Sequence, residues 1–202
     1  MDDADKYRAL LIEIKRRTSV ADAFISQKIN ALYEATTVES ACLQVRKILE
    51  LIAFGSLIAN KKVFKAQHEK FSKYWNAETM IRDMERINPN FYPKPILQKP
   101  SNKLGIKMEW LERPNDYLTK DKFVKVYKKC GAVLHAENPY GSKINYDYYG
   151  ENLIKWRNEI VNLLDAHSIR LLDDTNLYLF QMGSNDKNPS YTPFGLVYGV
   201  GT

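Results

Sequence analysis

The chain has 202 residues, 45% of them hydrophobic, and carries 30 Lys and Arg against 24 Asp and Glu, which gives a net charge of +6. This apolar content is close to the globular average and excludes global disorder, and the length is typical of one domain. We therefore expect residues 1–202 to form a single domain. The positive charge favours polyanionic partners, meaning nucleic acid or an anionic membrane surface.

The chain lacks the signals of the main metabolic enzyme classes, of export and of metal binding. It has no Walker A loop, dinucleotide glycine fingerprint, nucleophile elbow or His-Glu-x-x-His motif, so we expect no cofactor. Its two cysteines, Cys42 and Cys130, show no metal-ligand spacing and predict buried free thiols without a metal site. The acidic N-terminus and the shortness of the longest apolar run indicate a cytoplasmic protein with no membrane partner.

The first half of the chain predicts helices over residues 5–35, 38–60, 61–75 and 77–87. The first of these segments forms one helix or two, because Thr18 and Ser19, followed by Asp22, are typical of an N-cap. The segment 38–60 is apolar almost all round, which predicts the central helix of a bundle. Within it Arg46 and Glu50 lie one turn apart, so their side chains meet on one face.

The second half predicts helices over residues 120–135 and 151–166, and strands over 106–111, 177–182 and 194–200. Pro93 and Pro95 predict an extended loop before the first strand. The turn sequence at 183–190 joins the last two strands into a hairpin that packs on the helices or pairs with 106–111. The expected fold is mainly α: a compact bundle of five or six helices over residues 5–168, with a small C-terminal β-hairpin within 176–200.

Gly131 and His135 lie one helical turn apart on one face of the helix predicted over 120–135. A glycine inside a helix costs about 1 kcal/mol relative to alanine, so the close approach of another helix or of a ligand would explain it. His135 lies near the helix C-terminus, where the macrodipole favours a protonated imidazole. The alternative is a core histidine bonded to a carbonyl, with Asn138 and Pro139 ending the helix.

Arg157 is followed by the polar Asn158 on a late helix, and this pair resembles the start of the HEPN signature. HEPN domains are compact helical bundles, and many act as metal-independent ribonucleases in toxin and antiphage systems. Their signature is Arg, a polar residue and then His a turn or two later. The likeness covers the helical layout of about residues 5–168 and these two residues.

The chain departs from the HEPN pattern in the position of its next histidine. His167 follows Arg157 by ten residues, which is about 15 Å along a continuous helix and about 80° around it. Either the helix ends before His167, or His135 replaces the missing histidine, or there is no catalytic site. The alternative for Arg157 is a surface position on an amphipathic helix.

The resemblance implies a metal-independent ribonuclease or toxin-type effector acting on RNA in antiphage defence. His135 would then serve as general acid or base, Arg157 would stabilise charge on the phosphate together with Lys129, and Asn138 would orient the histidine or the phosphate. HEPN-like sites often form where two subunits meet, so the resemblance also implies a homodimer.

Two lysine clusters predict a phosphate-binding surface, for RNA rather than DNA, that includes Lys61, Lys65, Lys122, Lys125 and Lys129. Interleaved aromatic residues would stack on bases. The alternative is a solvated basic face with the aromatics in the core. Arg46 and Glu50 form either a structural ion pair or a supporting pair in which the arginine binds a phosphate in a central cleft.

The alternative interpretation is a non-catalytic helical module that binds nucleic acid or a partner protein within a larger complex. The broken spacing between Arg157 and a histidine favours it. The aromatic, glycine-rich C-terminus favours it too, because such a segment can dock a partner by strand addition at an unpaired edge.

Overall fold

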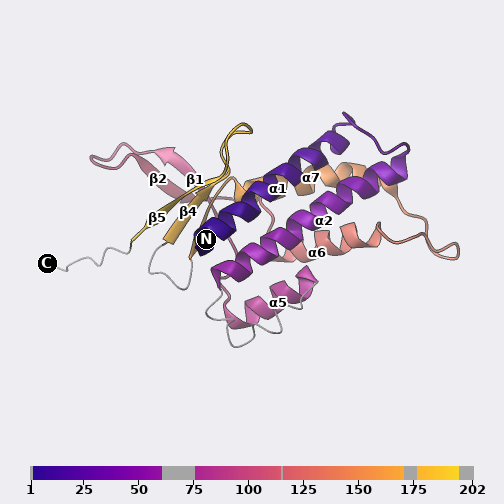
Figure 1. The fold of residues 1–202 in the computed structure, drawn as a ribbon, viewed down its shortest axis with the longest axis horizontal. Coiled ribbons are helices and arrows are strands. Elements are labelled where there is room, and N and C mark those ends of the chain that lie inside the picture. The colour runs from indigo at the N-terminus through magenta and orange to yellow at the C-terminus, as the bar shows by residue number, and fades with distance from the viewer. Residues whose placement is uncertain (1, 61–75, 115, 171–176, 196–202) are drawn as a thin grey trace.

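The computed structural model describes residues 2–60, 76–114, 116–170 and 177–195 (Figure 1). Its helices are α1 (Asp3–Ile25), α2 (Glu34–Ala59), α5 (Ala77–Ile87), α6 (Lys120–Ala132) and α7 (Tyr146–Leu164). Its strands are β1 (Lys94–Pro100), β2 (Met108–Glu112), β3 (Ala166–Arg170), β4 (Leu177–Gln181) and β5 (Ser190–Phe194). The predicted basic helix over 61–75, with Lys61 and Lys65, lies outside the described residues. In the described part no helix is both long and apolar enough to cross a bilayer.

The helix α2 lies at the centre of the bundle and packs against α1, α5, α6 and α7. Its inward positions carry apolar side chains that are almost completely buried, including Cys42, Val45 and Leu49. Gly55 lets α1 come close, because a Cβ atom there would lie only 2.9 Å from the Tyr7 ring. The central helix predicted over residues 38–60 is therefore present, and it begins four residues earlier.

The first helix is continuous, so the predicted break at Thr18 and Ser19 is wrong. Both hydroxyls donate back to carbonyls one turn earlier, those of Ile14 and Lys15, instead of capping a new helix. The helix ends at Ile25, and residues 26–33, which were expected to continue it, form a loop before α2.

The fold is mainly helical as predicted, but the β element is larger than a hairpin. Five antiparallel strands form one sheet in the order β2-β1-β3-β4-β5. The predicted C-terminal hairpin is β4 and β5, and its described second strand occupies 190–194. Most of the strand predicted over 194–200 lies outside the described residues. The strand β1 was expected to begin as a loop, and β3 begins where helix α7 was expected to end. Pro95 is tolerated because the ladder between β1 and β3 has only two residue pairs.

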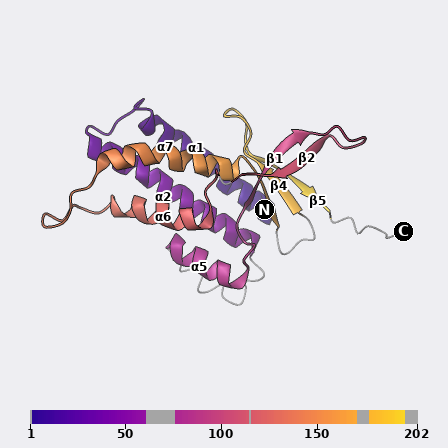
Figure 2. The same ribbon diagram turned by 180° about the vertical axis from the view of Figure 1, so that it is seen from behind.

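The sheet packs on one end of the helices through an aromatic cluster. Phe180 and Tyr191 pair across β4 and β5, and the Phe180 ring lies 4.5 Å from the ring of Tyr7 on α1. The sheet also curls, because Trp110 and Phe194, on its two edge strands, meet edge to face at 4.7 Å. The β1–β2 hairpin projects beyond the helices at this end, and the α1–α2 and α6–α7 connections lie at the opposite end (Figures 1 and 2).

Candidate functional site

The residues proposed for catalysis near the end of α6 lie in the loop that follows it. The helix ends at Ala132, so His135 lies three residues beyond it, exposed and without a hydrogen-bonding partner for its ring among the described residues. Asn138 organises a turn: its Oδ1 accepts from the backbone N of Tyr140 at 3.0 Å, and its carbonyl accepts from the N of Gly141 at 2.8 Å.

Arg157 is held by a carboxylate on another helix. Its Nε and Nη2 donate to the two oxygens of Asp22 on α1 at 2.6 and 2.7 Å. This hydrogen-bonded partner raises the pKa of Arg157 above its ordinary value, although partial burial opposes the shift. The pair joins α7 to α1, and bidentate geometry of this kind satisfies two of the five guanidinium donors.

Within one chain the structure does not bring Arg157 and His135 together. The helices α6 and α7 run antiparallel, since Tyr149 binds the carbonyl of Lys129 near one end and Lys122 binds Glu159 near the other. Arg157 lies eight residues beyond Tyr149, about 12 Å along α7 in the direction of the sheet. His135 follows Lys129 by six residues in the opposite direction along the bundle.

The lysines predicted to bind phosphate differ in their surroundings. Lys122 donates to the buried carboxylate of Glu159 at 2.8 Å and to the carbonyl of Tyr117 at 3.3 Å, so it has a structural partner. Lys125 is exposed and has no ion-pair partner among the described residues, while the Lys129 ammonium lies 5.1 Å above the ring of Tyr148. Only part of the predicted basic surface on α6 is therefore available to a ligand.

Arg46 and Glu50 are paired, with 3.6 Å between Nε and Oε1. The guanidinium also donates to the hydroxyl and the carbonyl of Tyr127 at 2.7 and 3.2 Å, and it stacks on that ring. Gly131 makes room for this arrangement, because a Cβ atom there would overlap Nη1 of Arg46. The helix glycine thus makes room for a side chain of α2 rather than for a ligand, and the arginine has a structural role.

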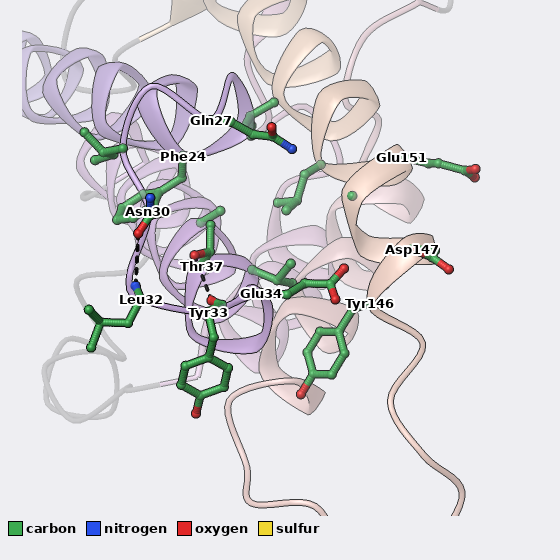
Figure 3. Close-up of a pocket in the computed structure, with 16 residues that line it drawn as sticks. Phe24, Gln27, Asn30, Leu32, Tyr33, Glu34, Thr37, Tyr146, Asp147 and Glu151 are labelled. Carbon is green, nitrogen blue, oxygen red and sulfur yellow. Dashed lines mark hydrogen bonds between the residues drawn. The ribbon is translucent and has the colours of Figure 1, made fainter.

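A pocket of about 880 Å³, which we call the distal pocket, opens at the end of the bundle away from the sheet. Its walls come from the end of α1 and the loop after it, the first turns of α2 and the first turns of α7 (Figure 3). Apolar side chains including Phe24, Val38 and Leu153 line it alongside polar groups. Its volume lies within the usual range of small-molecule and side-chain binding pockets.

The loop beside the distal pocket presents apolar groups to solvent. Leu32 is almost fully exposed and has a left-handed backbone with φ of 75°, which costs a non-glycine residue about 1 kcal/mol or more. Tyr33 is also exposed. The loop is held in place by Thr37, whose hydroxyl accepts from the N of Ala31 at 3.0 Å and donates to the carbonyl of Tyr33 at 2.9 Å.

The charged residues that line the distal pocket are all acidic: Glu34, Asp147 and Glu151. None of them forms an ion pair with a described residue, whereas most carboxylates on the helices have a Lys or Arg partner. Figure 3 shows Glu34 beside Tyr146. Partial burial raises the pKa of Tyr146, and the carboxylates around it, Glu34 among them, raise it further.

The distal pocket is suited to a cationic group on an apolar stem. Carboxylates attract the charge, the rings of Tyr33 and Tyr146 offer π faces, and the apolar wall accommodates the stem of a lysine or arginine. Among the described residues no three His, Cys, Asp or Glu side chains are placed to hold a metal ion. Sequence reasoning missed this pocket, because it predicted a helix through residue 35 where the structure has the loop that forms one wall.

No family model matches this chain, nor does any curated protein or solved structure. The resemblance to HEPN domains therefore rests on Arg157 and Asn158 and the helical layout, and it stays a prediction. Function has to be argued from the chemistry of the site.

Proposed function

We propose that this protein is a non-catalytic binding module, and that its distal pocket takes a basic and apolar segment of a partner protein. The observation that supports this most is the set of carboxylates without ion-pair partners around the pocket of a chain whose net charge is +6. Exposed Leu32 and Tyr33 beside them add the apolar, aromatic contacts on which protein interfaces depend.

The charges favour a protein partner over nucleic acid at this pocket. Glu34, Asp147 and Glu151 would repel a phosphate backbone, while they attract lysine and arginine. On α6, Lys122 already has a carboxylate partner in Glu159, and Lys128 has one in Glu78. Fewer lysines are then left to bind phosphate, since each contact with a polyanion requires an available cation.

The non-catalytic part of the proposal is supported by the surroundings of Arg157. Its guanidinium would have to stabilise a phosphate, yet it already binds both oxygens of Asp22. His135, the acid or base in the alternative function, lies in the loop after α6 and is exposed to solvent.

Selection of random peptides displayed on phage against the purified protein tests the proposal. We expect enrichment of peptides that combine Lys or Arg with neighbouring apolar residues, and loss of their binding in the double variant Glu34→Lys, Asp147→Lys. Both positions are first-turn acids of helices, so the matched control is Asp121→Lys, a first-turn acid of α6 away from the pocket. Peptides without a charge preference, or equal binding by the double variant, would contradict the proposal.

A further inference from the structure

The tip of the β1–β2 hairpin, residues 101–107, carries apolar side chains framed by lysines. Leu104 is fully exposed, and Ile106 is about half exposed. They flank Gly105, whose φ of 79° suits glycine, and Lys103 and Lys107 stand on either side. Leu104 and Ile106 are grouped at the end of a projecting hairpin, where they offer a small apolar surface for contact with a partner.

The hairpin tip is held in one conformation by its own hydrogen bonds. The backbone N of Ser101 donates to the carbonyl of Lys107 at 3.1 Å, and the N of Ile106 donates to the carbonyl of Lys103 at 3.1 Å. Five residue pairs join the strands behind it. An ordered tip loses little conformational freedom when it docks, which favours affinity.

Some lysines of this hairpin have no ion-pair partner among the described residues. Lys99 and Lys107 are exposed and have no ion-pair partner among the described residues, whereas Lys103 binds Glu109 at 3.0 Å. Lys107 lies in the tip and Lys99 near the end of β1, so this end of the hairpin carries two available cations together with the exposed Leu104 and Ile106. This is the combination of charge and apolar surface that the distal pocket is suited to bind.

The hairpin tip and the distal pocket lie at opposite ends of the molecule, so they cannot meet within one chain (Figures 1 and 2). The tip extends past the sheet, and the pocket lies where α1 ends and α7 begins. A contact between the two surfaces requires a second copy, and each copy would then offer one free tip and one free pocket.

We propose that the hairpin tip of one copy docks in the distal pocket of the next, so that the chain assembles head to tail. This inference rests on the proposed function and names the partner as a second copy of the chain. Leu104 and Ile106 contact the apolar wall, while Lys99 and Lys107 face Glu34 and Asp147 at its rim. Such a heterologous contact builds a ring if its rotation closes and an open filament if it does not.

Sedimentation velocity of the full chain at low ionic strength tests this directly. We expect wild type to self-associate with rising concentration, and added salt to weaken the association because the contacts are partly ionic. A tip variant (Leu104→Ser, Lys107→Ser) and a pocket variant (Glu34→Lys, Asp147→Lys) should each weaken self-association about tenfold or more. All four positions are exposed, so the variants should fold like wild type.

Mixing the two variants gives the sharpest result. The tip variant keeps an intact pocket and the pocket variant keeps an intact tip, so the mixture should form a heterodimer and no larger species. The matched control removes the same chemistry elsewhere on the surface, by Ile154→Ser with Lys125→Ser, and should associate like wild type.

Two results would overturn the inference. The first is a wild-type chain that stays monomeric at every concentration it tolerates. The second is self-association that the tip and pocket variants leave unchanged, which places the interface elsewhere. In either case, peptides bound through Glu34 and Asp147 would still support the proposed function. The peptide experiment therefore distinguishes a wrong head-to-tail contact from a pocket that binds no basic segment.

Discussion

The hydroxyl of Tyr7 lies 2.9 Å from Nε2 of His167, and Nδ1 of the same ring lies 2.9 Å from the carbonyl oxygen of Leu164. The carbonyl can only accept, so Nδ1 carries the proton, and Nε2 accepts from Tyr7. Both side chains are buried, and burial raises the pKa of Tyr7 while it lowers the pKa of His167 to about 4. The first helix and the sheet are thus joined by a neutral, fully bonded histidine.

This histidine should make the fold sensitive to mild acid. Its pKa of about 4 in the folded chain lies below the ordinary 6.5, so the unfolded state takes up the proton first as the pH falls. The stabilisation is complete above about pH 6.5 and is lost progressively toward pH 4, by roughly 3 kcal/mol in total. Urea denaturation at about pH 7.5 and about pH 5 measures the loss.

Two variants serve as references for this pH dependence. Replacement of the exposed His135 with alanine should leave it as in wild type. In His167→Gln the amide can donate to Leu164 and accept from Tyr7 without titrating, so the unfolding free energy should be lower at neutral pH but flatter between about pH 6.5 and 5. Equal slopes in wild type and His167→Gln would assign the pH dependence to other groups.

Arg157 should matter for stability through Asp22. Arg157→Ala and Asp22→Ala should each lower the unfolding free energy by about 1 kcal/mol, because both side chains are partly exposed and the pair is bidentate. The double variant should cost little more than either single one, since removal of one partner already abolishes the pair. Strictly additive losses in a thermal or urea cycle would show that the two residues act separately.

Incubation with total RNA in EDTA tests the ribonuclease function. We expect wild type, His135→Ala and Arg157→Ala to leave the RNA equally intact, because His135 and Arg157 are not assembled in one site. Cleavage by wild type that both variants lack would support the HEPN-like function with these residues and would contradict the non-catalytic proposal. Circular dichroism of each variant excludes unfolding as the cause of any loss.

Two lysines on one face of α6 should respond differently to the same change. Lys122→Ala leaves the carboxylate of Glu159 buried without its cation, so it should destabilise by about 2 kcal/mol. Lys125→Ala removes an exposed lysine and should change stability by less than about 0.5 kcal/mol. Thermal unfolding distinguishes them, and similar melting temperatures would mean that the bond between Lys122 and Glu159 contributes nothing.

The effect of Gly131→Ala on stability should change sign with the residue at position 46. In wild type the new methyl group displaces the Arg46 guanidinium from Tyr127, and the loss of these charged hydrogen bonds, about 2 kcal/mol, outweighs the gain in helix propensity, which is at most about 1 kcal/mol. In an Arg46→Ala background the space is empty, so the same change should stabilise by about 0.5 kcal/mol. A change of the same sign in both backgrounds would refute the steric explanation.

Local patterns accounted for the helices better than for the sheet. The all-round apolar character of 38–60 identified the central helix, and the glycine at 131 indicated a close approach that Arg46 provides. The strand β1 escaped prediction because it contains two prolines. The strand β3 escaped because its sequence, AHSIR, has only one β-branched residue and follows α7 almost directly. The two strands pair with each other although they lie far apart in the sequence, and each also pairs with a nearby strand, β2 or β4.

The candidate site was harder still to predict, because it is formed by residues far apart in the sequence. The distal pocket is built from the end of α1, the start of α2 and the start of α7. No single one of these segments has a sequence pattern that predicts a pocket. The sequence suggested that Arg157 is a phosphate ligand or a surface residue, because its partner Asp22 lies 135 positions away. A carboxylate with that separation cannot be matched to one arginine among many by spacing alone.

Contacts of α1 with the last strands also set an order of events during folding. The Lys15 ammonium binds carbonyls of the β4–β5 turn, including Met182 and Lys187, and Arg8 binds the carbonyl of Pro189 at 2.6 Å. The ribosome makes these partners more than 160 residues after Lys15 and Arg8. During synthesis α2 and α7 emerge before this turn, so the bonds of Lys15 and Arg8 to it form only when nearly the whole chain has been made.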